Sequence, residues 1–200
     1  NEAITGRVGI GTFGLFLHLG GSNPLPLTYV DNCVDAIVSA VDRRAMTRVA
    51  FVNPDCVNIA ARDPHYRALL AGTDWVCPDG IGMKIAGRIL NQPVRQNLNG
   101  TDLFPRLCAA LAANGKSLYL LGARPGVAEA VARWAKQHYP QLAIAGFRSG
   151  YFAPGEEQAV VAEIRRAQPD VLLVAMGAPR QEQWLKRHLR HTGAVVGIGV

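Results

Sequence analysis

The sequence predicts an α/β protein: a single Rossmann-like domain with a mostly parallel sheet, helices on both faces and a small N-terminal hairpin. Continuously apolar runs alternate with helix-like segments of about a dozen residues, the pattern of parallel strands that are buried on both faces. Of the 200 residues, 49% are hydrophobic and 18% are charged, which is typical of a globular chain with one core. No repeat, low-complexity run or linker interrupts the chain, so residues 1–200 are expected to form one domain.

In the first half, the periodicity of apolar residues predicts each element. The first 27 residues are rich in glycine and are expected to form a hairpin of short strands. Apolar residues at helical spacing predict a helix over residues 28–44, capped by Thr28 or Asp31. The other elements expected here are strands at 48–53 and 75–80 and helices at 54–63, 64–74 and 81–90, the second of these helices ending near Gly72.

The second half alternates more regularly. Gly115 marks the end of one predicted helix, and Pro125 marks the start of the next. In open parallel sheets, ligands bind beyond the carboxyl ends of the strands, so we expect the functional site at the turns that follow strands. The elements expected in this half are helices at 102–115, 124–140, 155–169 and 178–193 and strands at 117–122, 142–147, 170–177 and 194–200.

The charge balance favours anionic partners. The formal net charge is +6 and the sequence pI is about 9.5, which suits nucleic acid, an acidic membrane surface or a phosphorylated small molecule. Lys186, Arg187 and Arg190 share one predicted helix, whose simplest interpretation is a solvated face. Because no helix-turn-helix, RNP-type or zinc pattern accompanies these charges, no nucleic-acid partner is expected.

Cysteine usage and hydropathy indicate the compartment. The four cysteines are widely spaced, without metal-binding spacing, and are expected to be buried free thiols in a reducing, cytoplasmic environment. No signal peptide is recognisable, and no apolar run reaches the roughly 18 residues of a membrane span. The chain lacks an initial Met and ends on an apolar run at residues 194–200; we therefore expect it to be a fragment.

Two glycine-containing motifs are not interpreted as nucleotide sites. "GIGTFG" at residues 9–14 matches a dinucleotide fingerprint, but no helix is expected to follow it, so a hairpin explains it better. "NGKS" at residues 114–117 precedes a strand, whereas a phosphate-binding P-loop follows one. No D-x-D motif occurs, although many nucleotide-sugar enzymes use one to hold a metal. We accordingly expect no metal or other cofactor.

The Pro-Asp-Gly turn at residues 78–80 holds one carboxylate behind an apolar strand. Asp79 either caps the helix that follows or faces a substrate, and its position at the carboxyl edge favours the second interpretation.

Other strand-to-helix turns leave two interpretations open. Gly122, with Arg124 after it, is either an ordinary tight turn or an anion site on free helix N–H groups. Gly177 and Pro179 repeat this geometry, followed by two polar residues that cap the helix or reach a ligand. Thr101 or Asp102 is the natural N-cap of its helix, and Tyr151 either packs or stacks on a base.

Several segments occur together in one order: "FVNPDCV", "DWVCPDGIGMKIAG", "NGTDLF", "LYLLGARPGV", "GYF" and "VAMGAPRQEQW". Over residues 28–200 they resemble the WecG/TagA/CpsF family of bacterial glycosyltransferases (family 26). The resemblance implies an inverting hexosyltransferase that moves an N-acetylmannosamine-type sugar, its uronic acid or glucose. The implied donor is a UDP-sugar, and the acceptor is a polyprenyl-diphosphate-linked saccharide used in teichoic acid or exopolysaccharide biosynthesis.

The same resemblance assigns roles to residues. The proposed catalytic base of the family falls on Asp79, an active-site glutamine falls on Gln181, and Asn53 lines the same pocket. The candidate substrate-binding residues are Asn53, Gly80, Asn97, Thr101, Asp102, Gly122, Arg124, Tyr151, Gly177, Pro179, Gln181 and Glu182.

Two positions depart from the family pattern. Phe51 replaces a common threonine, and Asn97 replaces a common arginine, although Arg95 lies close by. Both departures suggest a donor or acceptor different from that of the teichoic acid enzymes. The family also continues into a basic tail, which implies peripheral attachment at the inner face of the plasma membrane. A homo-oligomer is possible.

Two other classes of function remain as alternatives. A non-catalytic nucleotide- or sugar-phosphate-binding regulator on the same fold would bind UDP without transferring sugar. A nucleotide-dependent oxidoreductase is disfavoured, because no acidic ribose anchor follows the only G-x-G-x-x-G motif.

Overall fold

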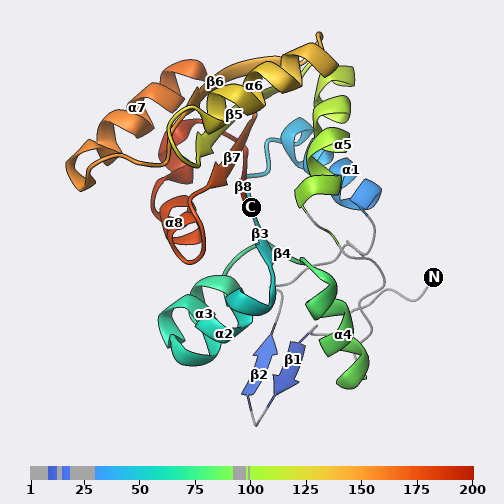
Figure 1. Cartoon of the computed structure of the whole chain (residues 1–200). Coiled ribbons are helices and arrows are strands. Elements are labelled where there is room, and N and C mark those ends of the chain that lie inside the picture. Colours follow the sequence, from blue (N-terminus) through green and yellow to red (C-terminus); the bar gives the residue numbers. More distant parts are fainter. Residues whose placement is uncertain (1–8, 13–14, 19–29, 92–97, 99) are drawn as a thin grey trace.

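The fold is organised by a parallel sheet of six strands, in the order β4-β3-β8-β7-β5-β6 (Figure 1). The computed structural model describes residues 9–12, 15–18, 30–91, 98 and 100–200. All five neighbouring pairs of this sheet run parallel, which confirms the predicted fold class. The strands are β3 (Thr47–Val52), β4 (Trp75–Pro78), β5 (Ser117–Gly122), β6 (Ala143–Arg148), β7 (Val171–Ala175) and β8 (Val196–Gly199).

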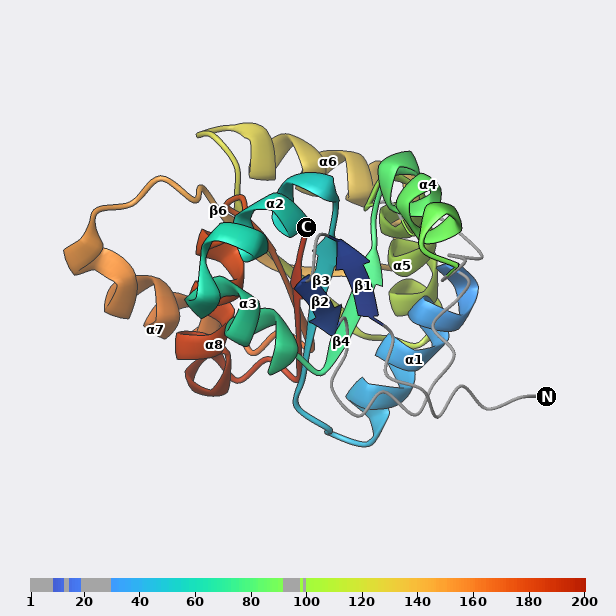
Figure 2. The same ribbon diagram turned by 90° about the horizontal axis from the view of Figure 1, so that it is seen from below.

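Helices cover both faces of the sheet. In Figures 1 and 2, α2, α3, α7 and α8 lie on one side, and α1 and α5 lie on the other. The helices are α1 (Val30–Asp42), α2 (Pro54–Arg62), α3 (Pro64–Ala71), α4 (Ile81–Ile89), α5 (Gly100–Ala113), α6 (Val127–His138), α7 (Glu157–Ala167) and α8 (Arg180–Thr192), with a short 3₁₀ helix η1 (Pro154–Glu156) before α7.

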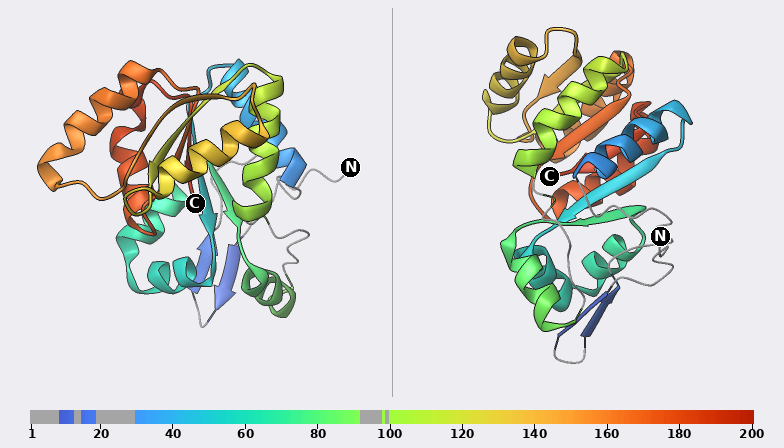
Figure 3. Two further views of the ribbon diagram at one scale, coloured as in Figure 1. Left: turned by 45° about the horizontal axis from the view of Figure 1, so that its top comes forward. Right: turned by 90° about the vertical axis from the view of Figure 1, so that its right-hand side faces the viewer.

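Strand β5, which lies next to the edge strand β6, shows why both faces are covered. Leu118 and Leu120 pack with α1, α5 and α6, whereas Tyr119 and Leu121 pack with α7 and α8. Side chains alternate across a strand, so a run that is apolar at every position needs a helical layer on each side. Helix α4 lies outside these layers (Figures 1 and 3), and its buried Met83 belongs to the same hydrophobic cluster as residues of β3, α2 and α3.

The described part of the N-terminal segment forms the antiparallel strand pair of the expected hairpin. Strands β1 (Gly9–Thr12) and β2 (Leu15–His18) pair antiparallel, with Gly9 opposite His18. This confirms that "GIGTFG" is not a dinucleotide fingerprint. The "NGKS" segment likewise ends α5, with Gly115 at φ +61°, and leads into β5.

Local sequence signals set several helix ends. Pro54 and Pro64 begin α2 and α3, where a missing N–H costs no helical hydrogen bond. The side chain of Asn53 accepts a hydrogen bond of 3.0 Å from the N–H of Cys56, and Asp63 accepts bonds from two N–H groups of α3. Gly72 ends α3, as predicted.

Two of the capping predictions are wrong. Helix α1 begins at Val30, so Asp31 lies in its first turn, where it forms an ion pair with Arg106; the alternative cap, Thr28, lies outside the described residues. Helix α5 begins at Gly100, so Thr101 and Asp102 are in its first turn and are not the N-cap. In both cases helical hydrogen bonding begins one or more residues before the polar side chain.

The structure bears on two further predictions, the state of the four cysteines and the lack of a membrane-spanning helix. Cys33, Cys56, Cys77 and Cys108 are all free and buried, as expected. Within the described ranges, no helix is both long enough and apolar enough to cross a bilayer.

Candidate active site

Asp79 lies directly beyond the carboxyl end of β4 and is tied to the neighbouring strand. Its backbone N–H donates a hydrogen bond of 2.8 Å to the carbonyl of Val52, the last residue of β3. In the sheet register Val52 faces Pro78, so the residues that follow these two strands leave the sheet side by side. Asn53 and Asp79 are therefore brought together at one edge, as the family resemblance implied.

Asp79 does not cap α4. The N-cap position is Gly80, whose φ of +91° is favoured only by glycine, and no side-chain hydrogen bond closes the start of the helix. The capping interpretation of Asp79 is therefore wrong. The Pro-Asp-Gly sequence instead holds the carboxylate at the sheet edge, ahead of the helix.

The electrostatic surroundings of Asp79 suit a base. Partial burial raises the pKa of its carboxyl above the usual value, and the backbone N–H of Gly80 acts in the opposite direction. No ion pair joins Asp79 to a Lys, Arg or His of the described residues. A raised pKa makes the carboxylate a better proton acceptor at neutral pH.

The turn between β7 and α8 forms a second part of the edge. Gly177 has a φ of +78°, and its N–H donates a bond of 3.0 Å to Oε1 of Gln181. Nε2 of Gln181 donates a bond of 2.9 Å to Oε1 of Glu182. Both side chains are buried, at 3% and 4% exposed. Gln181 and Glu182 therefore hold the Gly177 turn in place, and Pro179 joins α8 to it through a cis peptide bond.

A buried polar cluster, formed by Tyr66, Glu182 and Cys56, lies beside this turn and is connected to it through the bond between Glu182 and Gln181. Burial raises the pKa of Glu182, and burial beside Glu182 and Cys56 raises the pKa of Tyr66 well above its usual value. Neither the Tyr66 hydroxyl nor Oε2 of Glu182 has a hydrogen-bond partner among the described residues. The sequence pattern does not indicate Tyr66, because a single tyrosine in an amphipathic helix gives no signal of its position.

Gly122 ends β5 where the backbone leaves no room for a side chain. Its φ is +145°, and a Cβ atom there would lie 2.3 Å from the carbonyl oxygen of Ala175. The next N–H, that of Ala123, donates a bond of 2.7 Å to the same oxygen, and Gly150 bonds back to the carbonyl of Ala123. The turns after β5, β6 and β7 are thus locked together, with the exposed Arg124 beyond them.

The segment that precedes α5 is hydrogen-bonded to the residue before Asp79. The N–H of Leu98 donates a bond of 3.1 Å to the carbonyl of Pro78, one residue before the candidate base. Thr101 and Asp102 follow on the exposed side of the first turn. Asn97 lies outside the described residues, so its predicted role stays a prediction.

Tyr151 is not brought close to Asp79. It follows β6, which lies at the opposite end of the sheet from β4, and five strand spacings correspond to about 24 Å. Its side chain is 69% exposed. Beside it, Arg180 donates a bond of 3.0 Å to the carbonyl of Gly150 and lies 5.4 Å from the ring centre of Phe152. Arg180 therefore links the turn after β6 to α8, a role that no motif in the sequence predicts.

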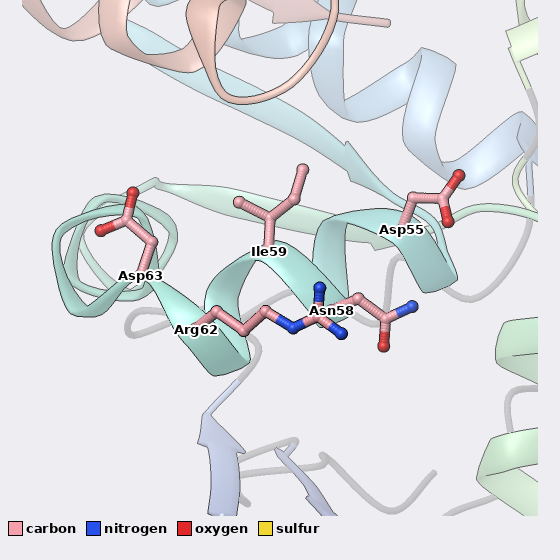
Figure 4. Close-up of a pocket in the computed structure, with 5 residues that line it drawn as sticks. All are labelled: Asp55, Asn58, Ile59, Arg62 and Asp63. Atoms are coloured by element: carbon pink, nitrogen blue, oxygen red, sulfur yellow. The ribbon is translucent and has the colours of Figure 1, made fainter.

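Two surface pockets are lined by described residues. One of about 440 Å³ follows α2 and contains none of the predicted residues; its lining is Asp55, Asn58, Ile59, Arg62 and Asp63 (Figure 4). The other, of about 580 Å³, lies between the starts of α5 and α6 and is mostly apolar; it includes Thr101, Phe104, Pro125 and Trp134. The described residues contain no group of three or more His, Cys, Asp or Glu side chains arranged to hold a metal ion.

Phe51, one of the two departures from the family pattern, is a buried residue of β3. Its side chain is 4% exposed and packs in the core with residues of α1 and α5. Phe51 is therefore part of the hydrophobic core, and this position offers no hydroxyl group.

These features define an open-sheet α/β protein whose candidate base lies at the carboxyl edge of two neighbouring strands. The family model described as "Glycosyl transferase WecG/TagA/CpsF family" matches residues 21–200. The chain belongs to this family, which confirms the resemblance seen in its motifs.

Relatives with assigned activities share part of their length with this chain. It is 30% identical over 173 residues to the N-acetylglucosaminyldiphosphoundecaprenol N-acetyl-beta-D-mannosaminyltransferase of Bacillus subtilis (strain 168), covering 86% of this chain and 62% of that protein. A protein of the same name from Staphylococcus aureus (strain NCTC 8325) is 31% identical over 152 residues, covering 76% of this chain and 59% of the relative. The chain thus spans about 60% of the length of these relatives.

Proposed function

We propose that this chain is the sugar-transferring domain of an inverting glycosyltransferase with a UDP-sugar donor and an undecaprenyl-diphosphate-linked acceptor. The observation that carries the proposal is Asp79, which is partly buried, does not cap a helix and lies beside Asn53 at the carboxyl edge. The names of the relatives support an N-acetylmannosaminyl group transferred to N-acetylglucosaminyl-diphosphoundecaprenol. A glucosyl group remains the alternative.

In the proposed reaction, Asp79 accepts the proton of the acceptor hydroxyl as its oxygen attacks the anomeric carbon of the donor. The bond between that carbon and the diphosphate oxygen breaks, UDP departs with the electron pair, and the configuration inverts. N–H groups in the first turns of α6 and α8 would stabilise the departing diphosphate. Neither a metal ion nor another cofactor has a role in this scheme.

Attachment to the membrane belongs to the same proposal. The acceptor named for the relatives carries a polyprenyl lipid, so the enzyme would act at the inner face of the plasma membrane as a peripheral protein. A basic segment beyond the matched region would contribute to this attachment. An oligomeric assembly also stays a prediction.

Ligand-dependent thermal unfolding tests the proposal on the chain itself. UDP or a UDP-sugar at 100 times its dissociation constant should stabilise the fold by about 2.7 kcal/mol, whereas NAD and single-stranded nucleic acid should have no effect. Stabilisation by NAD alone would overturn the proposal. Binding of UDP without sugar transfer to a lipid-linked acceptor would favour the non-catalytic regulator.

A further inference from the structure

Helix α4 carries an exposed apolar stripe directly after the candidate base. Ile81, Ile85 and Ile89 are 67%, 53% and 75% exposed, and their spacing of four residues places them along one face. Met83 and Gly87, on the other side of the helix, are buried. The helix is thus held to the domain by its inner face, and the isoleucines point outward.

Two cations border this stripe. Lys84 and Arg88 lie three residues after Ile81 and Ile85, which places them beside the isoleucines. Neither forms an ion pair with any described residue, and α4 contains no acidic residue. The outer face therefore combines large aliphatic side chains with unpaired positive charge, which suits an anionic lipid surface.

Other exposed hydrophobic side chains gather at the same edge of the sheet. Besides the three isoleucines, Val127 at the start of α6 and Tyr151 after β6 are 44% and 69% exposed. Both follow the carboxyl ends of parallel strands, as α4 does. Met46, which precedes β3, is 59% exposed at the opposite edge. Phe147, within β6, is a further exposed hydrophobic side chain, at 44%. Of the large hydrophobic side chains that are exposed among the described residues, most therefore follow the carboxyl ends of strands, and three lie together on α4.

The area of the stripe argues against a second copy of the chain as its occupant. Nine residues of helix extend about 14 Å, and one face of such a helix offers far less than the roughly 800 Å² that each partner buries in a stable dimer. A bilayer requires no matching surface, and a short amphipathic face is enough to insert into it.

We propose that the outer face of α4 docks onto an anionic bilayer and so places Asp79 at the membrane surface. Ile81 is two residues from Asp79, so insertion of the stripe would bring the base to the headgroup level, where the diphosphate of a lipid-linked acceptor lies. The catalytic consequence of this docking rests on the proposed function. Membrane binding itself is measurable without any sugar.

The test is cosedimentation of the chain with vesicles of equal parts phosphatidylglycerol and phosphatidylcholine. The I81S/I85S/I89S variant should bind about tenfold more weakly or worse, because each buried isoleucine contributes to partitioning. The matched control is Met46→Ser, which removes an equally exposed hydrophobic side chain at the opposite edge and should bind as the wild type does. Circular dichroism and UDP-dependent stabilisation would verify that the triple variant is folded.

The charges are tested separately. The K84Q/R88Q variant should lose about fivefold in affinity per charge on phosphatidylglycerol vesicles, with no change on vesicles of phosphatidylcholine alone.

Equal vesicle binding by the wild type and the isoleucine variant would overturn the inference and leave the proposed function intact. So would a dimer, seen by sedimentation velocity, that the isoleucine variant loses while no form binds vesicles. Isoleucine-dependent vesicle binding without UDP binding would support the inference and count against the proposed function.

Discussion

The backbone N–H of Asp79 donates a hydrogen bond of 2.8 Å to the carbonyl oxygen of Val52. This bond extends the pairing of β3 and β4 by one residue beyond the strands, so Asp79 leaves the sheet beside Asn53. The carboxylate is consequently positioned by the sheet and not by α4. Its role can be tested by substitutions that leave the backbone unchanged.

Asp79→Asn should abolish most of the transfer activity while preserving UDP binding. The amide has nearly the same shape but cannot accept the proton, and general-base catalysis contributes about 10²–10⁴ in rate. The measurement is kcat with a lipid-linked acceptor, together with the dissociation constant for UDP. The substitution Asp55→Asn in the first turn of α2 is the control. Wild-type activity in Asp79→Asn would show that another group is the base.

The pH dependence of catalysis should reflect the raised pKa of Asp79. The base must be ionised, so kcat/KM should fall as the pH is lowered, with a midpoint above the ordinary aspartate value of about 3.9. Burial is the main cause of the shift. A midpoint at or below the ordinary value would contradict the burial of this carboxyl in the free enzyme.

Glu182→Gln should become increasingly stabilising as the pH rises. Burial raises the pKa of Glu182 in the folded state. The wild-type carboxyl therefore contributes stability that is fully present below its unfolded pKa of about 4.3 and is lost as the pH rises through the folded value. Chemical unfolding of both proteins at several pH values measures the difference. A stability difference between the two proteins that narrows toward neutral pH would argue against a buried carboxylate without a cationic partner.

Gln181→Ala should destabilise the fold by about 1–3 kcal/mol, because it removes the acceptor of the Gly177 N–H and leaves Glu182 without its amide donor. Gln183→Ala, at an exposed position of the same helix, is the control and should change stability little. Denaturant unfolding distinguishes the two variants. Equal stabilities would mean that the Gly177 turn does not depend on Gln181.

Gly122→Ala should cost roughly 2 kcal/mol or more, because the new Cβ would collide with the carbonyl oxygen of Ala175 at an unfavourable φ. Gly115→Ala also places an alanine at a positive φ, but open space surrounds the Cβ position, so this substitution should cost only about 1 kcal/mol. Unfolding midpoints of the two variants give the comparison. A larger loss at Gly115 would refute the steric explanation.

Much of the fold could be predicted from local pattern. Apolar runs and proline or glycine signals gave the elements within a few residues, and the turns that follow the strands were recognised as the functional edge. The helix starts near Asp31 and Thr101 were misplaced, because a polar residue inside a first turn has the same local sequence appearance as an N-cap. The base role of Asp79 came from the family resemblance; the structure excluded the capping alternative.

By itself, the sequence determined the class of fold, the order of the elements, the family and the turn that holds Asp79, since each depends on residues close together in the chain. Only the tertiary structure decided which turns are neighbours. It placed Asp79 beside Asn53 through the bond to Val52, separated Tyr151 from them by most of the width of the sheet, buried Gln181 and Glu182, and left the isoleucines of α4 exposed. Strand order and burial depend on packing between segments far apart in sequence, and no local pattern records which segments will meet.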